Sequence, residues 1–357
     1  MNDKNNHTPR YHLHRYLAAA YLLFIIYVSL SPFSGWQEQG LHFVDVLLAP
    51  PTHTFTWFDA ILNCISYFPF GFLLAHTQRN HWTAPSILIW ATITGFSVSL
   101  MLEYTQMYLP SRVSSNIDLL SNTTGTFCGS VLALTLLKYT WFARVKIWHE
   151  QWIKYDKTTD FGLALLASWV FAQVNPSLPM LGSVFVSAIA RWPFDIVQAA
   201  PFNWLECAEV TLNMLLLGVL LSTLMRKRRN TLSALLLILG SVTLIKFMAA
   251  VLLLKSWALL LWLNSEAMLG ILIGLLLLFL LRKLTSRWLL RMSFLSAFFY
   301  LALVFNLILG SSRHSVMRLF HWQYIHMLNY NGLSQFINLI FPVLLLGYLW
   351  RTDVLRK

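Results

Sequence analysis

Three acid–amide pairs have the residue types and spacing of a chemical site. Within each pair the residues lie three or four positions apart, which in a helix places both side chains on the same face. The pairs are Asp59 with Asn63, Glu103 with Gln106, and Asp118 with Asn122. Each lies in or beside a long apolar stretch, where an ionisable group is costly. Together they could bind a polar molecule, exchange protons with it or hold a cation.

Four of these residues also have ordinary structural explanations. Asp59 and Asp118 fall in the first turns of predicted helices, where a carboxylate interacts favourably with the helix dipole. Asn63 and Asn122 could form hydrogen bonds between packed helices. The sequence leaves a functional and a structural role open for each of the four.

Glu103 is harder to explain by helix structure alone. It lies near the C-terminal end of its predicted helix, where the dipole disfavours a negative charge. Its charge would have to be offset by Arg112, by a bound cation or by protonation. We therefore expect a functional role for Glu103.

A second group of ionisable residues occurs later in the chain. Glu209 and Asn213 repeat the spacing of Asp59 and Asn63. Lys246 lies within an apolar stretch, about 13 Å below the membrane surface at 1.5 Å per residue. A lone Lys at that depth is expensive, so we predict a structural ion pair of Lys246 with Glu209 or Glu266.

The composition predicts that these residues are placed by membrane-spanning helices. Hydrophobic residues make up 57% of the 357 residues, charged residues only 11%, and the mean hydropathy is +0.60. Soluble domains carry about 25% charged residues. The fold class is therefore an all-α polytopic membrane protein with about ten transmembrane helices. The predicted spans are 16–33, 57–76, 85–108, 117–137, 160–177, 204–225, 231–254, 258–281, 292–310 and 332–350.

The basic residues predict the orientation. With the N-terminus inside, 20 of the 26 Lys and Arg residues fall in inside segments, five in outside segments, and Lys246 in a span. By the positive-inside rule both termini are cytoplasmic, and we expect a multi-pass protein of the bacterial cytoplasmic (inner) membrane. The net charge of +12 is explained by this bias and needs no nucleic-acid partner. The same topology places Glu103 about 9 Å below the outer surface, with the other pairs in the outer third of the bilayer and Arg112 above them.

The order of spans and acid–amide pairs predicts an internal duplication. A cytoplasmic segment is followed by a four-helix unit, a cytoplasmic linker, a diverged second four-helix unit in parallel orientation, and a C-terminal helix pair with an external interfacial segment. The predicted boundaries are 1–15, 16–138, 139–159, 160–281 and 282–357.

The polar residues of the first unit resemble a known family. Ser99-x3-Glu103-x2-Gln106-x3-Pro110-x-Arg112-x5-Asp118-x3-Asn122-x2-Gly125-x3-Gly129 is similar to the signature of VanZ-like proteins, as is Asp59-x3-Asn63 followed by Phe68-Pro69-Phe70-Gly71. The resemblance covers residues 15–138, about a third of the chain. It implies a bacterial cell-envelope protein related to an accessory factor in resistance to glycopeptide antibiotics such as teicoplanin. It also implies the shared set Asp59, Asn63, Glu103, Gln106, Arg112, Asp118 and Asn122.

The leading hypothesis is an outer-leaflet polar pocket that binds, or binds and modifies, an anionic or lipid-linked cell-surface molecule. Arg112 would hold a phosphate or carboxylate by bidentate hydrogen bonds, with Gln106, Asn63 and Asn122 as further binding residues. Glu103 would be the general acid or base, with Asp118 and Asp59 as further catalytic candidates.

The same residues also allow other hypotheses. Asp59, Glu103 and Asp118 could instead share a divalent cation. A transporter or flippase for an envelope component, and a non-catalytic scaffold for envelope enzymes, are the alternative functions. The expected partner is a membrane lipid or a lipid-linked envelope precursor, and the sequence identifies no protein partner.

Overall fold

The computed structural model describes most of the chain as helices. The described residues are 12–48, 50, 57–79, 82–136, 151–154, 156, 158–184, 202–227, 229–281, 286–309, 319–321 and 325–354. Within these ranges every regular element is a helix, apart from two isolated β-bridges. Seven helices are long and apolar enough to cross a membrane, which fits a multi-pass membrane protein.

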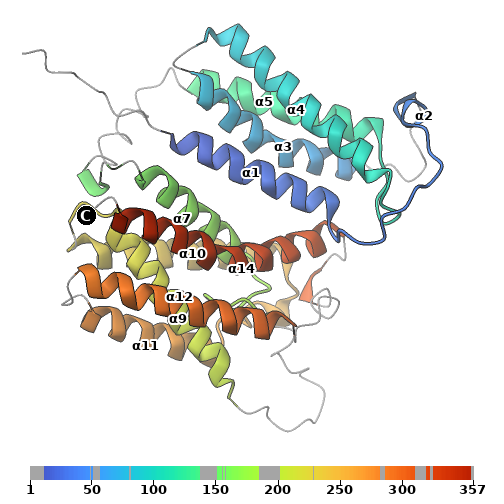
Figure 1. Ribbon diagram of the computed structural model, residues 1–357. Coiled ribbons are helices and arrows are strands. Elements are labelled where there is room, and N and C mark those ends of the chain that lie inside the picture. The colour runs from blue at the N-terminus through green and yellow to red at the C-terminus, as the bar shows by residue number, and fades with distance from the viewer. Residues whose placement is uncertain are drawn as a thin grey trace, which may run out of the picture. The chain divides into compact units, whose positions relative to one another are not determined.

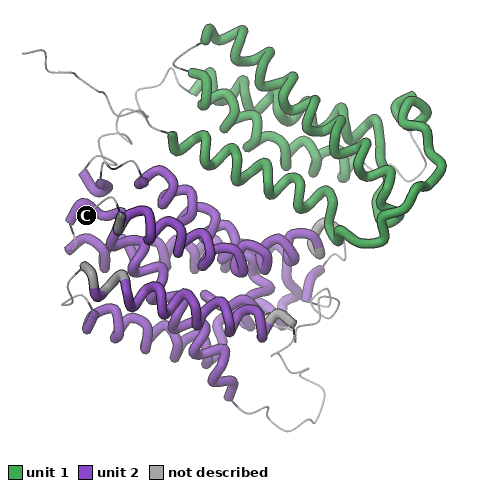
Figure 2. Tube along the Cα trace, viewed as in Figure 1, with its two compact units in different colours: residues 1–148 green, residues 149–357 purple. Residues whose placement is uncertain are grey.

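The chain divides into two compact units, residues 1–148 and 149–357 (Figure 2). The C-terminal helices belong to the second unit, where α12 (Ser286–Leu309) packs against α9 (Trp204–Leu224), and α14 (Ile325–Val354) packs against α7 (Thr159–Gln173). The five-part division expected from the sequence remains a prediction. Residues 1–11, and most of the linker 139–159, lie outside the described residues.

Unit 1 contains a short helix α2 (Phe43–Leu48) and four long helices (Figure 1). The long helices are α1 (Leu13–Leu30), α3 (Trp57–Gln78), α4 (Ala84–Gln106) and α5 (Asn116–Leu136). Pro85 in the first turn of α4 follows the general preference for Pro at helix starts. At most a third of each apolar window in these four helices is buried, so much of their apolar surface is available to lipid.

The α3–α5 pair is the most extensive helix contact of unit 1, and glycines make it possible. A Cβ added at Gly71 would collide with the carbonyl oxygen of Thr126, and one added at Gly129 would collide with that of Phe68. Small residues let helix backbones approach closely in membranes, where association depends on packing. The glycines therefore fix the spacing of the two helices that carry Asn63 and Asp118.

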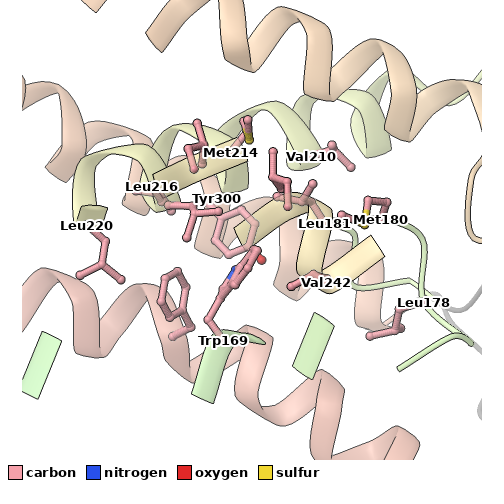
Figure 3. Close-up of a cluster of buried hydrophobic side chains, with 14 of the residues drawn as sticks. Trp169, Leu178, Met180, Leu181, Val210, Met214, Leu216, Leu220, Val242 and Tyr300 are labelled. Carbon is pink, nitrogen blue, oxygen red and sulfur yellow. The ribbon is translucent and has the colours of Figure 1, made fainter. Parts of the chain in front are cut away.

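Unit 2 is built around α9. This helix packs against α7, α10 (Asn230–Leu253), α11 (Ser265–Leu281) and α12, and 78% of its apolar window is buried. Figure 3 shows Met214 and Leu216 of α9 in one cluster with Trp169 of α7 and Tyr300 of α12. Because most of α9 is buried, its polar residues need partners inside the protein or a bound ligand.

An irregular segment is buried inside unit 2. After α7, residues 175–184 continue without a helix, and all ten are buried. Pro176, Pro179 and Gly182 explain why the helix does not continue. Residues 178–203 lie between the predicted spans 160–177 and 204–225, where an external loop is expected, but residues 178–184 of that loop are buried inside unit 2. We call residues 174–184 the buried segment. The rest of that loop, up to residue 201, lies outside the described residues.

Each of the ten predicted spans overlaps a helix, but several boundaries differ. The predicted span 160–177 ends at Gln173, and the predicted span 258–281 begins only at Ser265. Asn264 accepts a hydrogen bond from the backbone N–H of Ala267 at 3.0 Å and so starts α11. Helix α14 begins at Ile325, so the end of the predicted interfacial segment belongs to that helix. The rest of that segment lies largely outside the described residues.

Candidate functional site

The starts of α3 and α5 are joined by a hydrogen bond between two of the predicted site residues. Asn63 Nδ2 donates to Asp118 Oδ1 at 2.7 Å. The residues lie 55 positions apart in the sequence, and the glycine contacts described above bring their helices together. An amide donor to a carboxylate gives a short, charge-assisted bond. The structure therefore brings together two of the three acid–amide pairs.

Glu103 is buried, with 4% of its surface exposed, at the same end of the unit. Its Oε2 accepts a hydrogen bond from the backbone N–H of Ser115 at 2.9 Å, and Ser115 Oγ accepts one from Ile117 N at 3.2 Å. Ser115 thus caps α5, and the Glu103 carboxyl lies at the positive end of that helix. The unfavourable position of Glu103 on its own helix is offset by the N-terminus of a neighbouring one.

Asn122 and two residues without a predicted role complete the cluster. Asn122 Nδ2 donates to Ser99 Oγ at 3.0 Å, and both residues are buried. Tyr67 is buried on α3, within electrostatic range of Glu103 and Asp118. We call Asn63, Tyr67, Ser99, Glu103, Asp118 and Asn122 the amide–acid cluster.

Two atoms of this cluster point to a ligand. The Tyr67 hydroxyl and Asn122 Oδ1 are buried, and neither makes a hydrogen bond of good geometry among the described residues, although the Tyr67 hydroxyl lies near Ser99. Buried polar atoms are almost always hydrogen-bonded, so each exception needs a water or a ligand. Tyr67 could have been found from the sequence, because it lies four residues after Asn63 on the same helix face.

Arg112 and Gln106 are engaged elsewhere in unit 1. Arg112 Nη2 donates to the carbonyl oxygens of Val28 and Ser31, each at 2.7 Å, and Nε donates to Ser31 at 3.1 Å. Gln106 Nε2 donates to Ser29 O at 3.0 Å. The last carbonyls of a helix lack partners within it, so both side chains cap α1. Burial lowers the pKa of the Arg112 guanidinium.

This arrangement changes the expectation for Arg112. The Arg112 guanidinium, which was expected to bind a phosphate or carboxylate, donates instead to backbone carbonyls at the end of α1. Gln106 likewise serves α1. The contacts of both residues are structural, and their predicted role in substrate binding remains only a prediction.

A three-carboxylate metal site is not formed by the predicted residues. Among the described residues, no group of three or more His, Cys, Asp or Glu side chains is arranged to hold a metal ion. Asp118 is bonded to Asn63, and Glu103 to the backbone of Ser115. Asp59 is half-buried near the start of α3 and makes contacts of its own. The described residues show no arrangement of these three carboxyl groups around one ion, and a cation shared by Asp59, Glu103 and Asp118 stays a prediction.

In unit 2, Lys246 is fully buried but bonds to carbonyl groups. Its Nζ donates to Gln173 O at 3.0 Å and to Pro179 O at 3.1 Å, and lies 6.0 Å from the ring centroid of Trp262. These contacts do not involve Glu209 or Glu266, and the predicted ion pair stays a prediction. The irregular backbone around residue 179 leaves carbonyls without helical partners, and Lys246 satisfies one of them.

Other side chains also donate hydrogen bonds to the buried segment. Asn213 Nδ2 donates to Leu181 O at 2.7 Å, and Gln335 Nε2 donates to Ser183 O at 3.2 Å. Asn175 Nδ2 donates to Asn331 Oδ1 at 3.0 Å. Side chains from α9, α10 and α14 thus replace the hydrogen bonds of a helix. Of the residues in this network, only Lys246 and Asn213 stand out in the sequence.

One comparison with known proteins matches most of unit 1. Residues 16–139 match the family model described as VanZ/LLP1. No curated protein and no solved structure gives a significant match. The family resemblance expected over residues 15–138 is confirmed: the chain is a multi-pass membrane protein that carries a VanZ-like unit at residues 16–139.

Proposed function

We propose that this VanZ-like membrane protein acts in the bacterial cell envelope, and that its amide–acid cluster binds the polar headgroup of a lipid or lipid-linked surface molecule. The observation that carries the proposal is the pair of buried, unpartnered polar atoms, Tyr67 OH and Asn122 Oδ1, beside the buried Glu103. A buried acceptor gains most from a ligand that donates a hydrogen bond.

The chemistry of the cluster favours hydroxyl or amino groups on the ligand over a bare anion. Glu103, Asp118 and Asn122 present acceptor oxygens, and Arg112, the cation of the predicted set in unit 1, is bonded to α1. A sugar or alcohol headgroup supplies such donors. If the bound molecule is also modified, Glu103 is the proposed general acid or base.

The proposed orientation follows from the distribution of basic residues, and it puts the cluster in the outer leaflet of the inner membrane. Reporter fusions test it independently of activity. A fusion after Asn116 should read as external, and fusions after Arg79 and Arg229 as cytoplasmic. A cytoplasmic signal after Asn116 would move the cluster to the inner leaflet.

The binding proposal is tested by complementing a gene deletion with single variants. Glu103→Gln and Tyr67→Phe should each abolish the envelope phenotype, measured as the minimum inhibitory concentration of teicoplanin, while membrane levels stay near normal. Tyr104→Phe is the matched control, because Tyr104 is exposed and its hydroxyl bonds only to Tyr108 OH at 3.1 Å in the described residues. Full complementation by Glu103→Gln and Tyr67→Phe would leave the cluster a purely structural one.

Transport of an envelope component is a second candidate, favoured by the buried segment of unit 2. Non-helical backbone within membrane proteins occurs where it is buried or lines a cavity, and transporters use such segments for binding. Purified protein in vesicles, with a fluorescent lipid in one leaflet, tests this alternative. Faster exchange between leaflets than in protein-free vesicles would support it.

A further inference from the structure

Two carboxyl groups are fully buried at the start of α9. Glu206 and Glu209 lie three residues apart, on one helix face, and neither has any exposed surface. Glu206 Oε1 accepts a hydrogen bond from Asn264 Nδ2 at 2.7 Å. Glu206 Oε2 and both oxygens of Glu209 are buried without a hydrogen-bond partner among the described residues. Three carboxyl oxygens of this pair are therefore available to a ligand.

Two buried hydroxyl groups from other elements face the same place. Ser183, in the buried segment, faces the Glu209 carboxyl with its hydroxyl and its backbone N–H, although neither contact has the geometry of a full hydrogen bond. Tyr300 of α12 lies within electrostatic range of the same carboxyl (Figure 3 labels Tyr300). Both side chains have 0% exposed surface, and in the described part of the chain neither hydroxyl has a hydrogen-bond partner. Gln335 holds Ser183 in position through its backbone carbonyl.

These groups must be neutralised either by protons or by a positive charge, and the described side chains supply no such charge. A buried, unpaired carboxylate carries a large desolvation cost, and a second carboxyl group one turn away adds repulsion. The buried cation of this unit, Lys246, donates instead to the carbonyls of Gln173 and Pro179. The atoms left over are all oxygens, which is the ligand type that hard metal cations prefer.

We propose that Glu206, Glu209, Ser183 and Tyr300 form a binding site for a hard metal cation inside unit 2. The two carboxyl groups balance one divalent cation, or one monovalent cation with a proton on the second carboxyl. The hydroxyl groups complete the coordination as neutral ligands. The irregular backbone beside the carboxyl groups is also typical of ion sites in membrane transport proteins. This site is separate from the amide–acid cluster and does not depend on its function.

The test is the heat stability of the purified full-length protein in detergent. Na⁺, Ca²⁺ and Mg²⁺ are added separately, at constant ionic strength, against N-methylglucamine as a cation too large for the site. A ligand that binds only the folded state raises the midpoint of unfolding. At saturation we expect at least one of the three metals to raise it by about 3 °C or more.

Isosteric variants locate the effect. Glu209→Gln should abolish the metal-dependent rise and Ser183→Ala should weaken it, whereas Glu103→Gln, a buried carboxyl of unit 1, should retain it in full. Because Ser183→Ala removes only a hydroxyl group, it serves if Glu209→Gln fails to fold. No rise with any metal in the native protein, or an undiminished rise in both site variants, overturns the proposal. This measurement needs no envelope phenotype. The metal-site proposal can therefore fail or succeed independently of the function proposed for the amide–acid cluster.

Discussion

The two units of this protein use the same packing device around different polar interiors. In unit 1 the α3–α5 pair, and in unit 2 the α9–α11 pair, approach through glycines and are linked by an amide–carboxylate hydrogen bond. The bond joins Asn63 to Asp118 in unit 1, and Asn264 to Glu206 in unit 2, both at 2.7 Å. The amide is on the first helix of the pair in unit 1, whereas the carboxyl group is on the first helix of the pair in unit 2.

The polar interiors differ in what they stabilise. In unit 1, Glu103 and Arg112 satisfy helix ends, so part of the VanZ-like signature serves to hold four helices together. In unit 2, Lys246 and Asn213 satisfy an irregular backbone that has no counterpart among the described residues of unit 1. An ionisable residue in a membrane helix can thus be required by the backbone of a neighbouring element.

The glycine contacts should give the largest effect. Gly129→Ala places a Cβ against the backbone carbonyl of Phe68, which cannot rotate away, so α3 and α5 must separate. We expect a loss of more than about 3 kcal/mol, the upper range for overpacking, seen as loss of monodisperse protein in detergent. Gly274→Ala should cost less, because its Cβ meets the side chain of Met214.

Gly240→Ala is the control for this comparison. Gly240 has no neighbour within 4 Å of an added Cβ, and Ala is the better helix former. Its yield should equal or exceed that of the native protein. Equal yields for Gly129→Ala and Gly240→Ala would contradict the close approach of α3 and α5.

Lys246→Met distinguishes the carbonyl contacts from an ion pair. The variant leaves the carbonyls of Gln173 and Pro179 without this donor, at about 1–3 kcal/mol for each buried unsatisfied group. We expect a marked fall in folded protein, measured by heat unfolding in detergent. Adding Glu209→Gln or Glu266→Gln should not restore it, since neither carboxylate is bonded to Lys246. Recovery in a double variant would reinstate the ion pair.

Hydropathy and charge predicted the helices well because they report on the bilayer itself. Every predicted span overlaps a helix, and the family resemblance of residues 16–139 is confirmed. Residues 178–184 fall in the loop expected between two spans, because Pro, Gly and Ser residues usually mark solvent-exposed turns. Their burial depends on donors from α9, α10 and α14, which no local pattern reveals.

The site was predictable only where both partners are side chains with regular spacing. Asn63, Asp118 and Asn122 stand out by their intervals, and the structure places them together. The partners of Glu103 and Arg112 are backbone groups, of Ser115 in one case and of the end of α1 in the other. A backbone N–H or carbonyl has no residue type, so the sequence could not name it as a partner.

Exchanging the amide and the acid of unit 1 should give the smallest net effect. Asn63→Asp alone faces Asp118 with a second carboxyl group, and it removes a charge-assisted bond that typically contributes about 1.5–3 kcal/mol. Asp118→Asn alone keeps a neutral and weaker bond.

The double variant Asn63→Asp with Asp118→Asn reproduces the order found in unit 2, with the acid on the first helix and the amide on the side of its partner. Heat unfolding in detergent should therefore show that the double variant recovers most of the stability lost in Asn63→Asp. A double variant that is less stable than both single variants would show that the bond to Asn63 is not the main contact of Asp118. Complementation then distinguishes a structural role of the cluster from a binding role. If the cluster binds a headgroup, the double variant folds normally but fails to restore the envelope phenotype, because the carboxylate has moved from α5 to α3.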